Sequence, residues 1–287
     1  MNILVAYKKS TFDFYRVSPD AEVRAFMASN HPRAAMHRQD HEENARNLEA
    51  TVAALEHAGV TYEMVHRAAM GCAAGKDLVI AVGGDGTFLD AAHHIDSSIP
   101  ILGVNSTPST SDSVLLPYRA HELATVLDRL DLQPHHYLRR RQLTINGIET
   151  GPPVLNEILY ADLNPGATTN GLVRADGLVF EHHNGSGVLA STATGSTAFI
   201  WNEDATPLPL TSDRILVHER SRRHASHIEA DTVEIESWTR TAHVYLDGSH
   251  LSYPAGLRSV VRLEPGAAQL HFIGDLEKQR EKYVNAP

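Results

Sequence analysis

The residue with the clearest chemical potential in this chain is Asp85, which stands among three glycines in the pentapeptide Gly-Gly-Asp-Gly-Thr at residues 83–87. Glycine lets the backbone take positive φ angles and come close to a ligand, so successive backbone N–H groups can form a nest that binds phosphate. A carboxylate in such a turn repels phosphate unless it faces a hydroxyl group or a metal. The pattern therefore predicts phosphoryl transfer to an alcohol, with Asp85 accepting the hydroxyl proton.

The elements that must position this turn lie directly on either side of it. Residues 77–82 form an apolar run typical of a buried strand, and residues 87–92 continue as a helix. This order places the turn at a helix N-terminus, where anions bind favourably. A purely structural glycine-rich turn is the alternative. A Walker-type P-loop is disfavoured because no Lys-Ser or Lys-Thr pair follows the glycines.

Strands and helices alternate along the first part of the chain. We expect strands at residues 3–7, 62–67, 77–82 and 100–105, and a loop with a helical turn at 20–38. We expect helices from an Asp40 N-cap to Gly59 and at 120–131. Strands that alternate with helices predict a parallel sheet with covered faces. After Pro134, short apolar runs separated by Gly, Pro, Asn and Asp predict a β-rich region instead.

The predicted fold class is therefore an N-terminal doubly wound parallel α/β domain followed by a C-terminal β-rich domain. We expect the domains at residues 1–118 and 119–273. The tail at residues 274–287 either packs back on the first domain or is loose.

Composition limits the partners of the chain. Its 25 basic and 35 acidic residues give a formal net charge of −10, which argues against nucleic-acid and anionic-membrane surfaces. No run of about 18 apolar residues is present that could span a bilayer. Cys72 is the only cysteine, and the first predicted strand begins almost at Met1, so we expect no signal peptide and a cytoplasmic location. The adjacent histidine pairs would point to opposite faces of a strand, so no metal-ligating residues are predicted.

Three segments of the β-rich half carry further polar patterns. Asn156 and Glu157 are adjacent in a predicted strand, residues 191–199 hold several hydroxyl groups around a glycine, and Asp247-Gly248 is typical of a hairpin turn. The hydroxyl groups could cap a helix or bind ribose and amide groups. Each segment alone favours a structural role.

In this order, the glycine-rich turn and these three segments resemble the NAD kinase family over nearly the whole chain. The turn alone is also similar to that of diacylglycerol and sphingosine kinases. The family resemblance implies ATP-dependent phosphorylation of the adenosine-ribose 2′-hydroxyl of NAD or NADH. It also implies Mg²⁺ bound with the ATP and a homodimer or homotetramer.

The resemblance implies roles for individual residues as well. Asp85 is the predicted catalytic residue, and the dinucleotide is expected against Asn156, Glu157 and the pocket around Phe199. The complete set of predicted nucleotide-binding residues is Gly83, Gly84, Gly86, Thr87, Asn156, Glu157, Ser186, Thr194, Thr197, Ala198, Phe199 and Asn202.

Several positions depart from the family pattern. Phe199 stands where the family has a tyrosine, and this replacement keeps ring stacking but loses the hydroxyl group. Ser186 stands where an acidic residue is usual. Residues 200–204 replace a serine and a Gly-Gly-Pro segment, whereas residues 105–108 are similar to the mitochondrial and plant NADH-kinase branch. A dinucleotide-binding regulatory protein without turnover is therefore one alternative function. A lipid kinase is a second, which the acidic composition disfavours.

Overall fold

The computed structural model describes residues 1–221 and 226–285. Its contacts form two compact units, Met1–His136 with His271–Gln279 and Tyr137–Leu270 with Arg280–Pro287. The domain limits at residues 118 and 273 stay a prediction. Within the described residues, no helix combines the length and the apolar character that crossing a membrane would require.

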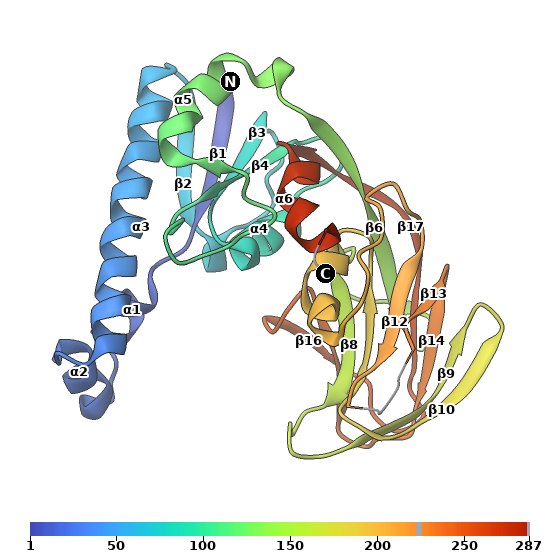
Figure 1. Cartoon of the computed structure of the whole chain (residues 1–287). Helices are drawn as coiled ribbons and strands as arrows, with labels where there is room; N and C mark the ends of the chain where they lie inside the picture. Colours follow the sequence, from blue (N-terminus) through green and yellow to red (C-terminus); the bar gives the residue numbers. More distant parts are fainter. Residues whose placement is uncertain (222–225, 286–287) are drawn as a thin grey trace. The chain divides into compact units, whose positions relative to one another are not determined.

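The first unit consists of short parallel strands with helices between them (Figure 1). Its strands are β1 (Asn2–Tyr7), β2 (Thr61–His66), β3 (Leu78–Gly83), β4 (Ile101–Asn105) and β5 (Tyr118–Arg119). Its α-helices are α1 (Thr11–Tyr15), α2 (Ala21–Ala28), α3 (Pro32–His57), α4 (Asp85–Ala92) and α5 (Leu123–Asp128). Its 3₁₀ turns are η1 (Arg67–Ala69), η2 (Ala120–Glu122) and η3 (Leu130–Leu132).

The strands of this unit are ordered β2-β1-β3-β4, and all of these pairs are parallel. The chain leaves β1 for β2 on one side and later returns to β3 on the other side. The point between β1 and β3 is therefore a topological switch point, where open α/β sheets bind ligands at the carboxyl ends of their strands. The predicted doubly wound parallel α/β unit is confirmed, and the residues 83–87 leave β3 at this edge.

The core of the first unit lies between this sheet and two helices. Alternate strand residues such as Val5 and Ile80 pack with Leu55 of α3 and Leu123 of α5. This arrangement follows from the side-chain periods of 2 in strands and 3.6 in helices. In Figure 1, α3 is the long helix beside β2, with α1 and α2 near its first turns.

The expectation of a loop at residues 20–38 and a helix N-cap at Asp40 was wrong. The helix α3 begins at Pro32, because proline suits a first helical position and the ring nitrogen of His31 accepts the N–H of Arg33 (3.1 Å). Asp40 lies inside the helix and accepts a hydrogen bond from the Thr110 hydroxyl (2.9 Å). Its polar side chain therefore anchors the loop that follows β4 and does not cap the start of a helix.

The second unit contains two antiparallel sheets, as the prediction of a β-rich domain required. Its remaining strands are β7 (Ile148–Glu149), β8 (Glu157–Asp162), β9 (Thr169–Ala175), β10 (Leu178–Gly185), β11 (Val188–Ser191), β12 (Ile215–Glu219), β13 (Ile228–Ala230), β14 (Val233–Ser237), β15 (Ala242–Leu246) and β16 (Leu251–Pro254). Three elements cross the division between the units: β6 (His135–Ile145), β17 (Val260–Ile273) and α6 (Leu276–Val284). The 3₁₀ turns η4 (Gly195–Thr197) and η5 (Phe199–Glu203) follow β11.

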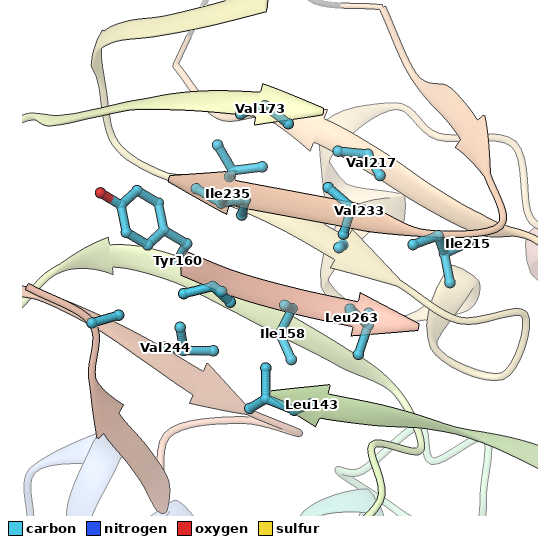
Figure 2. Close-up of a cluster of buried hydrophobic side chains, with 14 of the residues drawn as sticks. Leu143, Ile158, Tyr160, Val173, Ile215, Val217, Val233, Ile235, Val244 and Leu263 are labelled. Carbon is cyan, nitrogen blue, oxygen red and sulfur yellow. The ribbon is translucent and has the colours of Figure 1, made fainter. Parts of the chain in front are cut away.

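The core of the second unit is a sandwich between its sheets. One sheet pairs β10, β9, β14 and β17, and the other has the order β13-β12-β11-β8-β15-β16. Figure 2 shows side chains of both sheets pointing toward one another, among them Ile235, Tyr160 and Val244. Strands β9, β14 and β15 alternate between buried and half-buried residues, as strands with one covered face must. The opposite face of β8, β11 and β12 packs under residues 193–208.

Candidate functional site

The glycine-rich turn joins β3 to α4 at the switch point of the first unit. The N-cap of α4 is Gly84, whose backbone is extended (φ −127°, ψ −177°). Because glycine has no side chain, no side chain at the N-cap accepts a hydrogen bond from the first-turn amides. The first N–H groups of a helix lack intrahelical partners, and the helix dipole places partial positive charge there. The turn therefore presents amides suited to an anion.

The glycines of this turn do not use the positive φ angles that glycine permits. None of its glycines, Gly83, Gly84 and Gly86, has a positive φ among the described residues. Gly83 is required for close packing instead, because a Cβ atom there would lie 2.2 Å from Oγ1 of Thr87. Thr87 is only 1% exposed, and its Oγ1 has no hydrogen-bond partner within residues 1–221 and 226–285. Its side chain thus packs beneath the turn.

Replacing Gly83 with Ala should destabilise the protein. The added Cβ forces Thr87 to move, and such overpacking costs about 1–3 kcal/mol. Gly71→Ala is the matched control, because a Cβ at Gly71 meets no atom within 4 Å and its φ is not positive. Urea denaturation of both variants measures the difference, and equal stability for the two would contradict the packing role of Gly83.

Asp85 is the first residue of α4, and backbone amides hold its carboxylate. Oδ2 accepts the N–H of Val114 (3.1 Å), and Oδ1 accepts the N–H of Leu115 (2.8 Å). These bonds connect the turn to the loop that follows β4. A carboxylate oxygen accepts more than one hydrogen bond, so the amides orient Asp85 without exhausting its capacity to accept.

In the second unit, Asn156 and Glu157 lie where β8 begins, and Asp247 organises them. One Asp247 carboxylate accepts the backbone N–H groups of Leu155 (2.9 Å), Asn156 (2.7 Å) and Glu157 (3.0 Å). Asp247 itself occupies the predicted hairpin turn between β15 and β16, with φ 48°. The turn that the Asp-Gly pair predicted therefore also fixes the backbone of the Asn-Glu pair.

The side chains of this pair are buried and retain unused polar atoms. Asn156 is 6% exposed and Glu157 7% exposed. In the described part of the chain, Oδ1 of Asn156 and Oε2 of Glu157 have no hydrogen-bond partner. Burial, and then the negative charge of Asp247, raise the pKa of Glu157 to about 8. A neutral Glu157 can donate a hydrogen bond from its carboxyl group at neutral pH.

Glu157 should make stability depend on pH. The folded protein keeps Glu157 protonated up to about pH 8, whereas the unfolded chain ionises it above its ordinary value of 4.5. Its contribution is complete below pH 4.5 and is lost as the pH rises through about 8, a difference of at most about 5 kcal/mol. Glu157→Gln should therefore gain stability relative to the wild type between pH 5 and 8.5.

The measurement for this prediction is the free energy of unfolding across that pH range. Glu49→Gln on the exposed face of α3 makes the same charge change and should show no such gain. A pH-independent difference between Glu157→Gln and the wild type would mean that the carboxyl group ionises normally.

The hydroxyl-rich segment packs directly on this pair. The Thr192 N–H donates to the Asn156 carbonyl (2.7 Å), and the Thr192 hydroxyl donates to the Leu155 carbonyl (2.5 Å). A Cβ at Gly195 would lie 2.3 Å from the same Asn156 carbonyl, so only glycine fits there. We expected a helix to begin at the end of this segment, and the structure has two 3₁₀ turns there instead. Several hydroxyl groups of the segment donate to backbone carbonyls of the protein.

A cavity of about 530 Å³ opens beside Glu157. Ser186 and Phe199 line it together with Glu157, and so does Arg220. The Arg220 guanidinium lies 4.5 Å from the centre of the Phe199 ring and donates to Glu203 (2.8 Å). Arg220 was not predicted, because its loop carries no local pattern and only the fold brings it to the ring.

The other predicted residues of this unit lie in different surroundings. Thr194 and Thr197 are buried, and Ala198 links the two 3₁₀ turns. Asn202 lines a different cavity, of about 490 Å³, with Trp201 and Tyr283. The structure therefore brings together Glu157, Ser186 and Phe199 but places Asn202 elsewhere. Whether each predicted residue binds a nucleotide stays a prediction.

No group of three or more His, Cys, Asp or Glu side chains suited to a metal ion occurs within the described residues. Near the turn, Asp85 is held by backbone amides and Asp90 by Arg67 (3.1 Å). A divalent ion here would have to be bound largely by a ligand's own phosphates.

The fold and these groups define a two-unit α/β-plus-β protein with a glycine-rich turn at the switch point of its first unit. Residues 20–129 match the family model described as ATP-NAD kinase N-terminal domain. By this match and by the relatives below, the chain is similar to the NAD kinase family.

Curated relatives show the same similarity. A probable NADH kinase of Oryza sativa subsp. japonica is 29% identical over 62% of this chain and 64% of its own length. An NAD kinase of Corynebacterium jeikeium is 30% identical over 67% of this chain and 62% of its own. The matched part thus spans less than two thirds of either relative.

Solved structures share the fold. An NAD kinase from Archaeoglobus fulgidus in complex with ATP superposes with a TM-score of 0.67 at 17% identity. The superposition covers 97% of this chain and 95% of that kinase. A yeast NADH kinase complexed with NADH also has a TM-score of 0.67, at 13% identity, with coverage of 99% and 86%. The expected fold class is confirmed by this similarity.

Proposed function

We propose that the chain is an ATP-dependent kinase that phosphorylates the adenosine-ribose 2′-hydroxyl of NAD or NADH. The observation that carries the proposal is the position of Asp85, an oriented carboxylate in the first turn of α4 at the switch point of the sheet. In phosphoryl transfer to an alcohol, a carboxylate placed beside the phosphates accepts the proton of the attacking hydroxyl group.

In the proposed reaction, Asp85 accepts the proton of the ribose hydroxyl as its oxygen attacks the γ-phosphorus of ATP. The new O–P bond forms while the bond from the γ-phosphorus to the bridging oxygen breaks, and ADP leaves with that electron pair. Gly84 and the other first-turn residues offer backbone amides to the phosphates. Positioning and electrostatic stabilisation account for most of the catalysis in such transfers.

The buried polar groups of the second unit suit a dinucleotide acceptor. Oδ1 of Asn156 can accept a hydrogen bond from a ribose hydroxyl or an amide, and a neutral Glu157 can donate one. Phe199 offers a ring to a planar base at the cavity wall. The names of the rice and Corynebacterium relatives, NADH kinase and NAD kinase, agree with this choice of acceptor.

Mg²⁺ belongs to the proposal as a companion of ATP. It would neutralise charge on the β- and γ-phosphate oxygens, and the described residues assign it no protein cage. The homodimer or homotetramer and the cytoplasmic location expected from the sequence are part of the same proposal.

The test is a coupled assay with purified protein, ATP and Mg²⁺, in which NAD and NADH are offered separately and the 2′-phosphorylated product is detected. We expect product from at least one of them, and the ratio of kcat/KM values identifies the preferred acceptor. Calorimetric binding of a dinucleotide without product would favour the regulatory alternative. If neither NAD nor NADH gave product and neither dinucleotide bound, the proposal would be refuted.

A further inference from the structure

Two cationic side chains stand at the carboxyl edge of the first sheet, beside the glycine-rich turn. Lys8 follows β1 directly, and its backbone N–H donates to the carbonyl of Val82 (3.3 Å) at the end of β3. Arg67 opens η1, immediately after β2. Strands that are distant in sequence thus bring both cations to the switch point.

Both cations reach the backbone of the turn itself. The position that a Cβ would occupy on Gly84 is 3.9 Å from the Lys8 ammonium, 3.7 Å from Oγ of Ser111 and 3.8 Å from Oγ of Ser113. The corresponding position on Gly86 is 3.3 Å from Nη1 of Arg67. Because neither glycine has a side chain, a ligand on these backbone groups comes within reach of the cations and the hydroxyls.

The two cations differ in their ion pairing. Arg67 forms an ion pair with Asp90 of α4 (3.1 Å). Within residues 1–221 and 226–285, the Lys8 ammonium has no hydrogen bond and no ion pair closer than 4 Å. Burial and the charge of Arg67 lower the pKa of Lys8, and Asp40 opposes this effect. Two like charges held this close repel each other, and a bound polyanion would relieve the repulsion.

We propose that Lys8 and Arg67 form a cationic clamp on the triphosphate of the phosphoryl donor. The clamp rests on the proposed kinase function. Lys8 contacts phosphate oxygens above Gly84, and Arg67 contacts those above Gly86. As the bond between the γ-phosphorus and the bridging oxygen breaks, negative charge gathers on the departing diphosphate. Cations fixed in advance stabilise this charge without reorganisation.

The experiment compares Lys8→Met and Arg67→Met with Lys9→Met. Lys9 is the adjacent, exposed lysine, so the control removes the same charge one residue away. Calorimetry measures the affinity for MgATP and for inorganic tripolyphosphate, which lacks the adenosine. We expect both ligands to bind about 10- to 100-fold more weakly to Lys8→Met and Arg67→Met, because charge-assisted hydrogen bonds are lost. Lys9→Met should stay within about twofold of the wild type.

Thermal unfolding without ligand distinguishes a binding role from a structural one. Lys8→Met removes a charge that repels Arg67, so its melting temperature should equal or exceed that of the wild type. A lower melting temperature together with weaker MgATP binding would make Lys8 a structural residue and overturn its part in the clamp. Unchanged affinities in Lys8→Met and Arg67→Met would overturn the clamp altogether.

These outcomes separate the clamp from the kinase proposal. If the wild type binds MgATP but transfers no phosphate, the affinities of the variants still test the clamp. If the wild type forms product and Lys8→Met forms it with unchanged kcat and KM for ATP, the kinase function stands and the clamp fails.

Discussion

Asp85→Asn is expected to lower kcat by about 10²–10⁴-fold, the usual loss when a positioned general base is removed. An amide does not accept the ribose proton, so the attacking oxygen stays protonated in the transition state. The carbonyl of Asn can still accept the N–H of Leu115, while its NH₂ group would face the N–H of Val114 and lose that bond. The measurement is the steady-state rate with the preferred dinucleotide at saturating MgATP.

Two controls separate loss of the base from damage to the turn. Asp85→Asn should still bind MgATP calorimetrically and should unfold within a few degrees of the wild type. Asp96→Asn makes the same charge change in an exposed position after α4 and should keep its turnover. Nearly full activity in Asp85→Asn would remove Asp85 from the role of base. Loss of MgATP binding would instead show that Asp85 mainly holds the turn to the loop after β4.

The sequence was most informative where one physical requirement determines several neighbouring residues. A strand buried on both faces must be apolar throughout, so residues 77–82 predicted β3 almost to the residue. The hairpin turn needs left-handed backbone angles, and Asp247 and Gly248 adopt φ values of 48° and 112°. Both elements follow from local chemistry, and a single sequence therefore contains them.

Predictions failed where one local pattern served another purpose. Asp40 and Glu43 have the spacing of a capping box, but they bind the hydroxyls of Thr110 and Ser109 from inside α3. The true start uses the ring of His31, which is not among the preferred caps. The glycines of the turn are explained by contacts, such as that between Gly83 and Thr87, and not by positive φ. A sequence shows that glycine is present but not which of its properties the fold uses.

The candidate site was predictable as a set of motifs but not as an arrangement. Arg220 reaches the ring of Phe199 only because the antiparallel strand β12 carries it past the first residue of β11. Asn202 follows Phe199 closely in sequence, but the 3₁₀ turn η5 directs it to another cavity. Such contacts depend on the path of the chain, and nothing in the spacing of residues encodes them.

Removing the Asp247 carboxylate should cause one of the largest losses of stability in the second unit. Asp247→Ala leaves the amides of Leu155, Asn156 and Glu157 without their acceptor inside the protein. An unsatisfied buried N–H group costs about 1–3 kcal/mol, so the total should be about 3 kcal/mol or more. Asp247→Asn should lose less stability than Asp247→Ala, because its side-chain carbonyl can keep the bonds to Asn156 and Glu157. Both variants remove the negative charge of Asp247 and should therefore lower the pKa of Glu157.

The matched control is Asp176→Ala. Asp176 also accepts two successive backbone N–H groups, from Asp231 (2.8 Å) and Thr232 (3.2 Å), but its side chain is 29% exposed. Water can replace this carboxylate, so the free energy of unfolding should fall far less than in Asp247→Ala. Equal losses in the two alanine variants would show that burial does not set the cost.

Asp247 fixes the backbone from which Asn156 and Glu157 project. At temperatures where Asp247→Asn is fully folded, this variant should therefore also bind the dinucleotide more weakly than the wild type does. A folded Asp247→Asn variant with wild-type dinucleotide affinity would show that the pair holds its position without this carboxylate.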